Sequence, residues 1–278
     1  MHSWPPLHRL LVASDGTRTS SGALGYAAAL ARPSEALLHL IQAWSPSSGG
    51  LDSLAAGLPG TGLRQEDAQA LLNADTRTLT ALGVPPYRTS LVRGWPTTAI
   101  TEAARSWGAE LVILGSHRRG ALGRLALGTV SEGVVLQLDR PALVVHPSAQ
   151  AGACERVAVL TEARPRCDAP DPTVLWGARL AEAMGVPALL VAVPSAHGAS
   201  VTPAYLERQC ALVGEHSLVS VTGLQLARLP HIGHWSGESS TVVAARRASL
   251  TRAKRRLGPW LDQLLHATRA PVLVVPEL

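Results

Sequence analysis

The sequence contains one pattern of apolar and glycine-bearing segments twice, and this internal repetition constrains the fold more than any other feature. Three pairs of segments share a single offset: 111–114 with 241–244, Gly128 with Gly258, and 140–145 with 270–275. A shared offset over about 35 residues is hard to obtain by chance, and repetition takes precedence over residue-level interpretation. The chain is therefore predicted to consist of two copies of one folding unit.

The first two apolar segments of each copy also correspond, at slightly different offsets: 9–13 with 156–160, and 36–40 with 188–192. The second copy is therefore shorter than the first between its second apolar segment and Gly258, the counterpart of Gly128. The first copy has room there for a helix over 97–107. We expect the second copy to lack this helix or to have remodelled it around 231–235.

Short apolar runs rich in Val, Leu and Ile alternate with alanine-rich stretches of helical pattern. Uninterrupted apolar strands separated by helices indicate a parallel sheet that is covered on both faces, so the predicted fold class is α/β. In the first copy we expect five strands, at 10–13, 37–43, 88–92, 111–115 and 142–145. We expect helices at 20–31, 65–82, 97–107 and 128–138, and a long loop at 45–62.

Length and composition are typical of two medium-sized domains. The chain has 278 residues, and a domain takes about 100 to 200. No apolar run approaches the roughly 18 residues that span a bilayer, and the N-terminus has no signal-peptide organisation. Three cysteines without a C-x-x-C pair suggest neither a disulfide framework nor a thiolate metal site. We therefore expect a cytoplasmic location and no membrane association.

The chain carries a net charge of +5, and its densest basic segment is 245–256. Nucleic-acid binding needs such a patch together with interleaved aromatic or groove-reading residues, and this segment has no aromatic residue. A nucleic-acid partner is therefore not expected. A solvated basic face is the simpler interpretation, and contact with an acidic partner is the alternative.

Candidate binding residues follow the first and fourth predicted strands, because ligands of parallel sheets bind beyond the carboxyl ends of the strands. Asp15 can accept hydrogen bonds from a ligand, or it can cap the helix that begins near Ser20, and the sequence leaves both roles open. Gly115 leads into a glycine-rich basic loop, after which Gly128 and Thr129 begin a helix. The free N–H groups and the dipole at that helix start favour a phosphate.

Six segments of the first copy carry a family resemblance: LVASDGT at 11–17, LLHL at 37–40, VRGWP at 92–96, AELVILGSH at 109–117, LALGTVSE at 125–132 and RPALVV at 140–145. With them the chain resembles a tandem universal stress protein whose second copy is degenerate. The resemblance implies two tandem domains, each a five-stranded parallel, Rossmann-like sheet of the adenine-nucleotide alpha-hydrolase type, joined as a pseudo-dimer. It assigns residues 1–148 to the first domain and 154–278 to the second.

Nucleotide-binding members of this family hold ATP with G-x-x-G, nine residues and then G-S/T. The resemblance implies the following contacts: for adenine, Asp15 and the backbone of Leu40; for the ribose, Gly115 with Ser116 beside it; for the phosphates, Gly128, Thr129 and Val130. ATP, together with Mg²⁺, is the implied cofactor. We predict no dedicated metal ligands in the protein.

The second glycine of the family pattern is replaced by Arg118. A loop glycine usually permits a positive φ or a close backbone approach, which a side chain obstructs. Arginine is also a strong phosphate partner, and Arg119 and Arg124 add charge to the loop. Two interpretations are therefore open. In one, Arg118 contacts a phosphate and nucleotide binding is altered or weak; in the other, the loop is merely basic and solvated.

The second copy is a poorer candidate for binding. Its four pattern positions are Ala245, Ala248, Gly258 and Pro259, so the hydroxyl and one backbone donor of the G-S/T pair are lost. Glu162 takes the place of Asp15, although an ordinary turn residue explains it. We expect one functional site at most, with the degenerate half as its fixed partner.

No dedicated catalytic residues are predicted, since the chain has no Walker lysine, H-E-x-x-H or G-x-S-x-G pattern. Slow ATP hydrolysis stays open. His117 in the loop could act as a base, although an exposed loop histidine without an orienting partner is usually inert. His231 and His234 have a spacing that a metal could use, but Gly233 favours a turn and no further ligand is evident. Metal binding there is not expected.

The resemblance also implies that the last strands, 142–145 and 272–275, pair within one chain, since each would otherwise be an exposed apolar edge. Further assembly into a homodimer is left open. Two hypotheses for function follow. In the first, a stress-response protein binds an adenine nucleotide in its first domain and signals to a protein partner. In the second, the chain is a nucleotide-free interaction scaffold with abandoned sites.

Overall fold

A computed structural model describes residues 5–45, 64–116, 128–162, 171–193, 203–214, 221–225, 241–246, 261, 264–265 and 268–276. Several predictions from the sequence fall outside these residues. They concern most of the loop at 45–62, the remodelled segment at 231–235, the basic segment after Arg246, and His117, Arg118, His231, His234 and Pro259.

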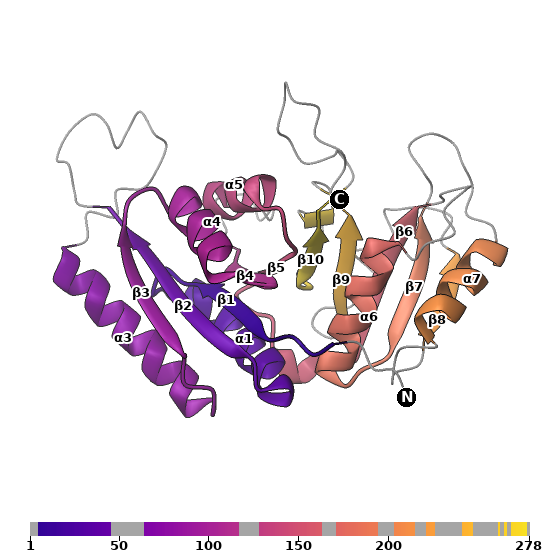
Figure 1. Cartoon of the computed structure of the whole chain (residues 1–278), viewed down its shortest axis with the longest axis horizontal. Helices are drawn as coiled ribbons and strands as arrows, with labels where there is room; N and C mark the ends of the chain where they lie inside the picture. The colour runs from indigo at the N-terminus through magenta and orange to yellow at the C-terminus, as the bar shows by residue number, and fades with distance from the viewer. Residues whose placement is uncertain are drawn as a thin grey trace, which may run out of the picture.

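A single ten-stranded sheet, in the order β3-β2-β1-β4-β5-β10-β9-β6-β7-β8, runs through the molecule (Figure 1). Its strands are β1 (Arg9–Ala13), β2 (Leu37–Trp44), β3 (Arg88–Arg93), β4 (Leu111–Gly115), β5 (Ala142–Val145), β6 (Arg156–Glu162), β7 (Ala188–Val193), β8 (Val221–Gln225), β9 (Thr241–Arg246) and β10 (Val272–Val275). All neighbours are parallel except β5 and β10. The α/β fold and the five strands expected in the first copy are confirmed.

The antiparallel pair at the centre joins the two parallel groups. Val272 lies opposite Val144, Leu273 opposite Leu143 and Val274 opposite Ala142. Outward from this pair, the strands follow one another in the same relative order on both sides. The pairing that the sequence predicts between the two last strands is therefore confirmed, and neither strand is left as an exposed edge.

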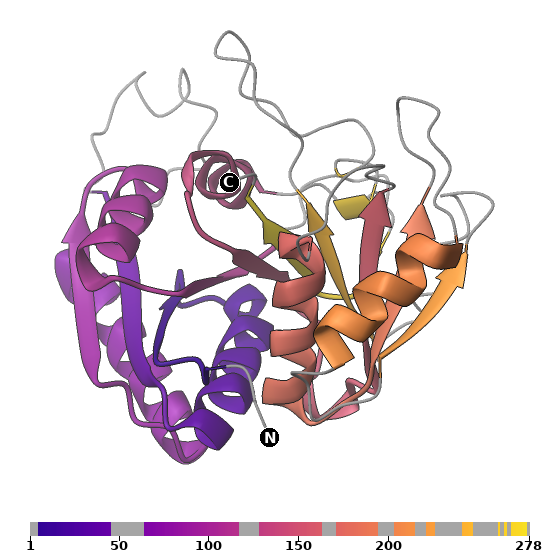
Figure 2. The same ribbon diagram turned by 45° about the vertical axis from the view of Figure 1, so that its right-hand side comes forward.

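The helices whose bounds fall among the described residues cover the sheet: α1 (Ser21–Ser34), α3 (Gln65–Ala81), α4 (Pro96–Trp107), α5 (Thr129–Gln137), α6 (Pro172–Met184) and α7 (Pro203–Gly214). The strands alternate between two cores. Leu10 and Val12 join a core with α1, α3, α6 and α7, whereas Leu11 and Ala13 join a core with α4 and α5. Both cores continue across β5 and β10. On the first face α1 contacts α6, and the two helices lie side by side in both views (Figures 1 and 2).

Helix ends follow from proline and glycine positions. Pro96 and Pro172 occupy first-turn positions of α4 and α6, where the missing N–H has no intrahelical partner. Gly108 and Gly185 end the same helices in the left-handed conformation, with φ of 66° and 67°. No helix in the part of the chain that the structure describes has the length and apolarity needed to cross a membrane.

A polar clasp links α6 to the first half of the chain. The Arg179 guanidinium lies 2.5 Å from Glu110 Oε2 and donates to the carbonyls of Pro5 and Pro6, each at 2.9 Å. Glu110 also accepts from the His8 N–H at 3.2 Å. The side chains of Arg179 and Glu110 are only 17% and 27% exposed, so solvent screens this ion pair less than a surface pair.

Substitutions at two glycines, one in α6 and one in α1, test how closely these helices pack. A Cβ added at Gly177 in α6 would lie 2.3 Å from Val159 Cγ2, whereas a Cβ at Gly25 in α1 would meet nothing within 4 Å. Gly177→Ala is therefore expected to lower the free energy of unfolding by about 1–3 kcal/mol. Gly25→Ala is expected to raise it by about 0.5–1 kcal/mol, because alanine is the better helix former. Urea unfolding measures both, and equal effects would contradict the packing of α6 on β6.

Arg179→Gln tests the clasp. The substitution leaves the carboxylate of Glu110 without its charged partner, and we expect the free energy of unfolding to fall by about 1–3 kcal/mol. Arg105→Gln is the matched control, because Arg105 contacts Asp139 with side chains 55% and 58% exposed; a loss within about 1 kcal/mol is expected there. A smaller loss at Arg179 than at Arg105 in urea unfolding would show that the clasp does not stabilise the fold.

Candidate functional site

The carboxyl ends of β1 and β4 lie side by side, because β4 pairs with β1 on the side opposite β2. The chain leaves β1 for a helix and β2, and later returns to β4 on the other side of β1. Such a reversal of strand order is where open parallel sheets bind ligands. The residues that follow these two strands, 14–17 and 115–116, therefore form the candidate site.

Asp15 fixes the loop that follows β1. Its Oδ1 accepts from the Thr17 N–H at 3.0 Å, from the Thr17 hydroxyl at 2.8 Å and from the Ser20 hydroxyl at 2.6 Å. These bonds hold the short 3₁₀ helix η1 (Arg18–Ser20), which leads directly into α1. Asp15 thus shapes the turn that leads into the helix but does not cap it, because the N-caps of η1 and α1 are Thr17 and Ser20. Its half-buried carboxylate lies at the candidate site.

Gly16 has to be glycine at this position. Its φ is +72°, and an added Cβ would lie 2.5 Å from Leu71 Cβ. Both the left-handed backbone and the close contact with α3 exclude a side chain. The backbone after Asp15 can therefore turn sharply against α3.

Gly115, the last residue of β4, brings the two loops together. A Cβ added there would lie 3.0 Å from the carbonyl oxygen of Thr19, so β4 ends directly against η1. The Gly115 carbonyl accepts from the Ser131 hydroxyl in the first turn of α5 at 2.8 Å. Asp15, Gly115 and the start of α5 are therefore connected through Ser20 and Ser131.

The start of α5 faces this junction without a side-chain cap. Gly128 is the N-cap in extended backbone, with φ of −60° and ψ of 146°, and no side chain of a described residue caps it. Thr129 is exposed, and Val130 is half-buried. The first backbone N–H groups of the helix therefore have no capping side chain, as an anion site requires.

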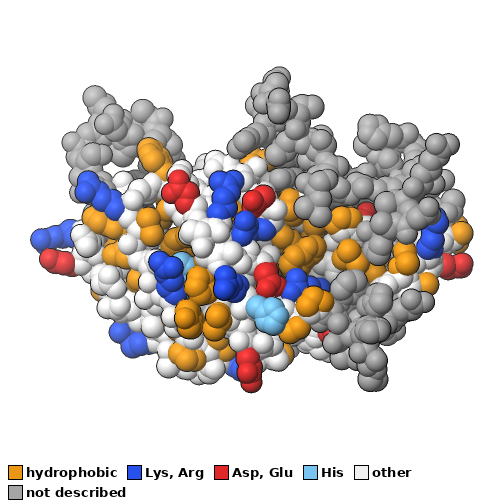
Figure 3. Space-filling model, in the orientation of Figure 1, with side chains coloured by type: hydrophobic (Ala, Val, Ile, Leu, Met, Phe, Trp, Pro, Cys, Tyr) orange, Lys and Arg blue, Asp and Glu red, His pale blue; other side chains and the backbone are white. Residues whose placement is uncertain are grey.

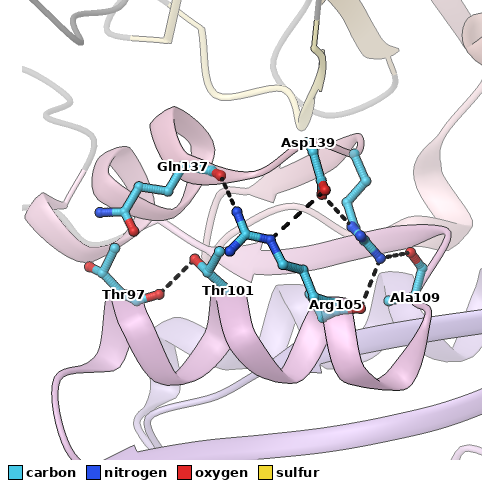
Figure 4. Close-up of polar contacts among 8 residues, drawn as sticks. Thr97, Thr101, Arg105, Ala109, Gln137 and Asp139 are labelled. Atoms are coloured by element: carbon cyan, nitrogen blue, oxygen red, sulfur yellow. Dashed lines mark hydrogen bonds and ion pairs between the residues drawn. The ribbon is translucent and has the colours of Figure 1, made fainter. Parts of the chain in front are cut away.

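A polar network at the other end of α5 holds the helix against α4 (Figure 4). Arg105 donates to the Gln137 carbonyl at 3.4 Å and lies 3.9 Å from Asp139. Arg140 binds Asp139 at 2.8 Å and the carbonyls of Ala104 and Ala109 at 2.9 Å. The hydrogen bond from Arg140 holds the pKa of Asp139 below its usual value. This network fixes the position of α5 and hence of its N-terminus.

Two other residues named by the family resemblance are Leu40, inside β2, and Ser116, directly after β4. Leu40 is buried inside β2, where it lies between Val12 of β1 and Thr89 of β3. Ser116 donates its N–H to the Val145 carbonyl at 2.8 Å, which keeps it beside β5. Contact of Leu40 and Ser116 with a nucleotide stays a prediction, and Arg118 lies outside the described residues.

Asp75 on α3 is a site residue that motif analysis missed. Its Oδ2 accepts from the Ser14 hydroxyl at 2.5 Å, and it is 8% exposed. Burial raises the pKa of Asp75; the hydrogen bond from Ser14 opposes this effect, and the charge of Asp15 adds to it. A signal was present in the sequence, because Asp75 occupies the buried stripe of α3 with Ala68, Leu72 and Leu79.

The described residues contain no group of three His, Cys, Asp or Glu side chains that could hold a metal ion. The two carboxylates at the site, Asp15 and Asp75, accept hydrogen bonds from neighbouring hydroxyl groups. His231 and His234 are not among the residues described.

Asp75→Asn tests the raised pKa. A carboxyl whose pKa is raised by folding contributes stability that is present below its unfolded pKa and is lost as the pH rises through the folded pKa. Asparagine keeps an oxygen for the Ser14 hydroxyl but does not ionise. The stability of Asp75→Asn relative to the wild type should therefore increase between pH 4 and pH 7. Asp67→Asn, exposed on the same helix, is the control, and a pH-independent difference for Asp75 would contradict its burial penalty.

Comparisons with known proteins agree with this architecture. The model of the universal stress protein family matches residues 6–146. Over 138 residues the chain is 32% identical to a universal stress protein of Thermus aquaticus, which covers 49% of this chain and 97% of that protein. A universal stress protein of Methanocaldococcus jannaschii is 27% identical over 144 residues, covering 49% and 81%.

The fold of the whole chain is similar to a solved structure. The crystal structure of a universal stress protein from Archaeoglobus fulgidus DSM 4304 has a TM-score of 0.70 at 17% identity, over 96% of this chain and 98% of that one. The similarity of fold thus extends over both halves, and the family model matches just over half of the chain. The chain belongs to the universal stress protein family.

Proposed function

We propose that this protein acts in a cytoplasmic stress response and binds an adenine nucleotide, ATP with Mg²⁺, in its first half. The observation that carries the proposal is the connected set of Asp15, Ser20, Gly115 and Ser131 at the carboxyl ends of β1 and β4. It joins an acidic loop to the N-terminus of α5 at the sheet position where ligands of such folds bind. Nucleotide binding would then be passed to a protein partner.

The chemistry of these groups suits the two ends of a nucleotide. Asp15 and Asp75 supply acceptors beside β1, and adenine and ribose carry the N–H and O–H donors that would bind them. The N-terminus of α5 supplies backbone N–H groups and a positive dipole for phosphates. Arg118 stands where the family has a glycine and would supply a cation for the phosphates, and Arg119 and Arg124 add charge nearby in the sequence.

We further propose that residues 1–148 and 154–278 are two domains of the same kind, joined as a pseudo-dimer. The equal strand order on the two sides of β5 and β10 supports this division. Ala245, Ala248 and Pro259 replace the family pattern in the second half, so one nucleotide is expected per chain. The second half then acts as a fixed partner of the first.

A second candidate function is a scaffold that binds no nucleotide. The observation that favours it is that Asp15 Oδ1 already accepts three hydrogen bonds from its own loop. This local role accounts for the residue without any ligand. The two candidates differ in what happens when the charge of Asp15 is removed while the loop is kept.

The test is a calorimetric titration of nucleotide-free protein with Mg-ATP. We expect saturable heat with one site per chain. Asp15→Asn keeps an oxygen that can accept from Thr17 and Ser20, but it removes the negative charge and one acceptor. Its affinity should fall at least about tenfold, the loss of one hydrogen bond to a charged group. Glu102→Gln, exposed on α4, removes the same charge elsewhere and should bind like the wild type.

Absence of heat up to millimolar ATP would contradict the nucleotide proposal and leave the scaffold. Equal affinity of Asp15→Asn and the wild type would show that Asp15 serves only its loop. Thermal unfolding of both variants separates a binding defect from a folding defect. Phosphate release from the same samples measures slow hydrolysis independently of binding.

A further inference from the structure

A cluster of aromatic and basic side chains lies at the amino ends of β1, β2 and β3, the opposite end of these strands from the candidate nucleotide site. Trp107, the last residue of α4, is its centre. The guanidinium of Arg9 lies 5.4 Å from the centre of the Trp107 ring, and Tyr87 stacks on Trp107 at 5.6 Å with the planes tilted by 33°. We refer to Arg9, Leu37, Tyr87, Arg88 and Trp107 as the Trp107 patch.

The strand register makes the Trp107 patch one continuous surface. Leu37 lies beside Arg9 in the sheet, and Arg88 lies beside His39, which follows Leu37 by two residues. His39 and Leu37 therefore point to the same face of β2, towards α4. Because α4 ends at Trp107, it does not extend over Arg9, Leu37 and Tyr87.

The Trp107 patch contains large hydrophobic side chains that are exposed to solvent. Tyr87 is 67% exposed and Leu37 is 38% exposed, and both are large hydrophobic side chains. Arg9 and Arg88 are also exposed. On the visible face of the first half, hydrophobic and basic side chains adjoin one another (Figure 3). Aromatic and arginine side chains are the types most enriched at protein interfaces.

The patch rests on a rigid support. His39 is buried under it, with its ring edge-on to Trp107 at 5.4 Å and its Nε2 2.9 Å from the Ser90 hydroxyl. Burial, together with the positive charge of Arg88, lowers the pKa of His39 to about 4. The imidazole is therefore neutral at neutral pH and supports the Trp107 ring without adding charge.

No carboxylate in the part of the chain that the structure describes balances the charge of the patch. Among the described residues, neither Arg9 nor Arg88 has a carboxylate within ion-pair distance. One N–H of the Arg9 guanidinium donates to the Trp107 carbonyl at 3.2 Å. A guanidinium has five N–H donors. The Glu110 N–H donates to the Arg9 carbonyl, but the Glu110 carboxylate binds Arg179 and the His8 N–H. The patch therefore offers positive charge beside exposed aromatic surface.

We propose that the Trp107 patch is a docking surface for an acidic segment of a partner protein. Carboxylates of the partner bind the guanidinium groups of Arg9 and Arg88, and an apolar or aromatic side chain of the partner packs on Tyr87 and Leu37. The net charge of +5 disfavours a second copy of this chain as the occupant. This inference does not depend on nucleotide binding, since the patch and the candidate nucleotide site lie at opposite ends of the strands.

The experiment measures fluorescence anisotropy of a labelled, capped peptide of alternating glutamate and tyrosine, titrated with the full chain without nucleotide. Arg9→Gln combined with Arg88→Gln should weaken binding by about tenfold or more, and Tyr87→Ala by about fivefold. Arg77→Gln combined with Arg93→Gln removes the same charge from exposed positions outside the patch. This control should bind within about twofold of the wild type.

Four results would overturn the proposal. The glutamate-tyrosine peptide does not bind, or the control pair weakens its binding as much as the Arg9 and Arg88 substitutions do. A lysine-tyrosine peptide binds equally well, or the wild type forms a dimer in sedimentation that the Arg9 and Arg88 substitutions abolish. The last result would assign the patch to a second copy of the chain. Arg88→Gln alone guards against a folding defect, because Arg88, unlike Arg9, makes no hydrogen bond to a described residue. It should weaken binding while thermal unfolding is unchanged.

Discussion

The antiparallel pairing of β5 with β10 is the interaction on which the rest of the structure depends. Each strand is short, buried and apolar along its whole length. Left alone, each would expose unpaired backbone groups and two apolar faces at the edge of a five-stranded sheet. Pairing removes both edges, and side chains of β5 and β10 then join the two cores on opposite faces of the sheet. Both halves therefore share their cores as well as their sheet.

The candidate site in the first half depends on this pairing through β4. Gly115 lies beside Val145 in the sheet, and Ser116 donates to the Val145 carbonyl. The end of β4 is thus held by β5, which is itself held by β10. The start of α5 is fixed from two directions, by Ser131 on Gly115 and by the network of Arg105 and Arg140 on α4. The second half can in this way stabilise the candidate site of the first.

Much of the fold follows from the sequence because it is encoded locally. The strands of the first copy and three of its four helices agree with their predicted bounds to within a residue, since apolar runs, Pro96 and Gly108 mark the ends. The pairing of β5 with β10 follows from the family resemblance and from their apolar character. Asp15, Gly115 and the start of α5 are found by the position of residues after strands.

The contacts that sequence analysis missed are those between distant segments. Arg179 contacts Glu110, Pro5 and Pro6 from a helix in the other half of the chain, and no local pattern marks the arginine as different from its neighbours. The Trp107 patch needs three strands and the end of a helix to bring its members together.

The role of Asp15 is partly local and partly long-range. Its local hydrogen bonds follow from its position near Ser20, yet a ligand contact depends on groups that the sequence places far away. A ligand bound to its carboxylate would act on η1, which lies against Gly115 and leads into α1; α1 in turn contacts α6 of the second half. The same residue that shapes the loop therefore connects the candidate site to the interface between the halves.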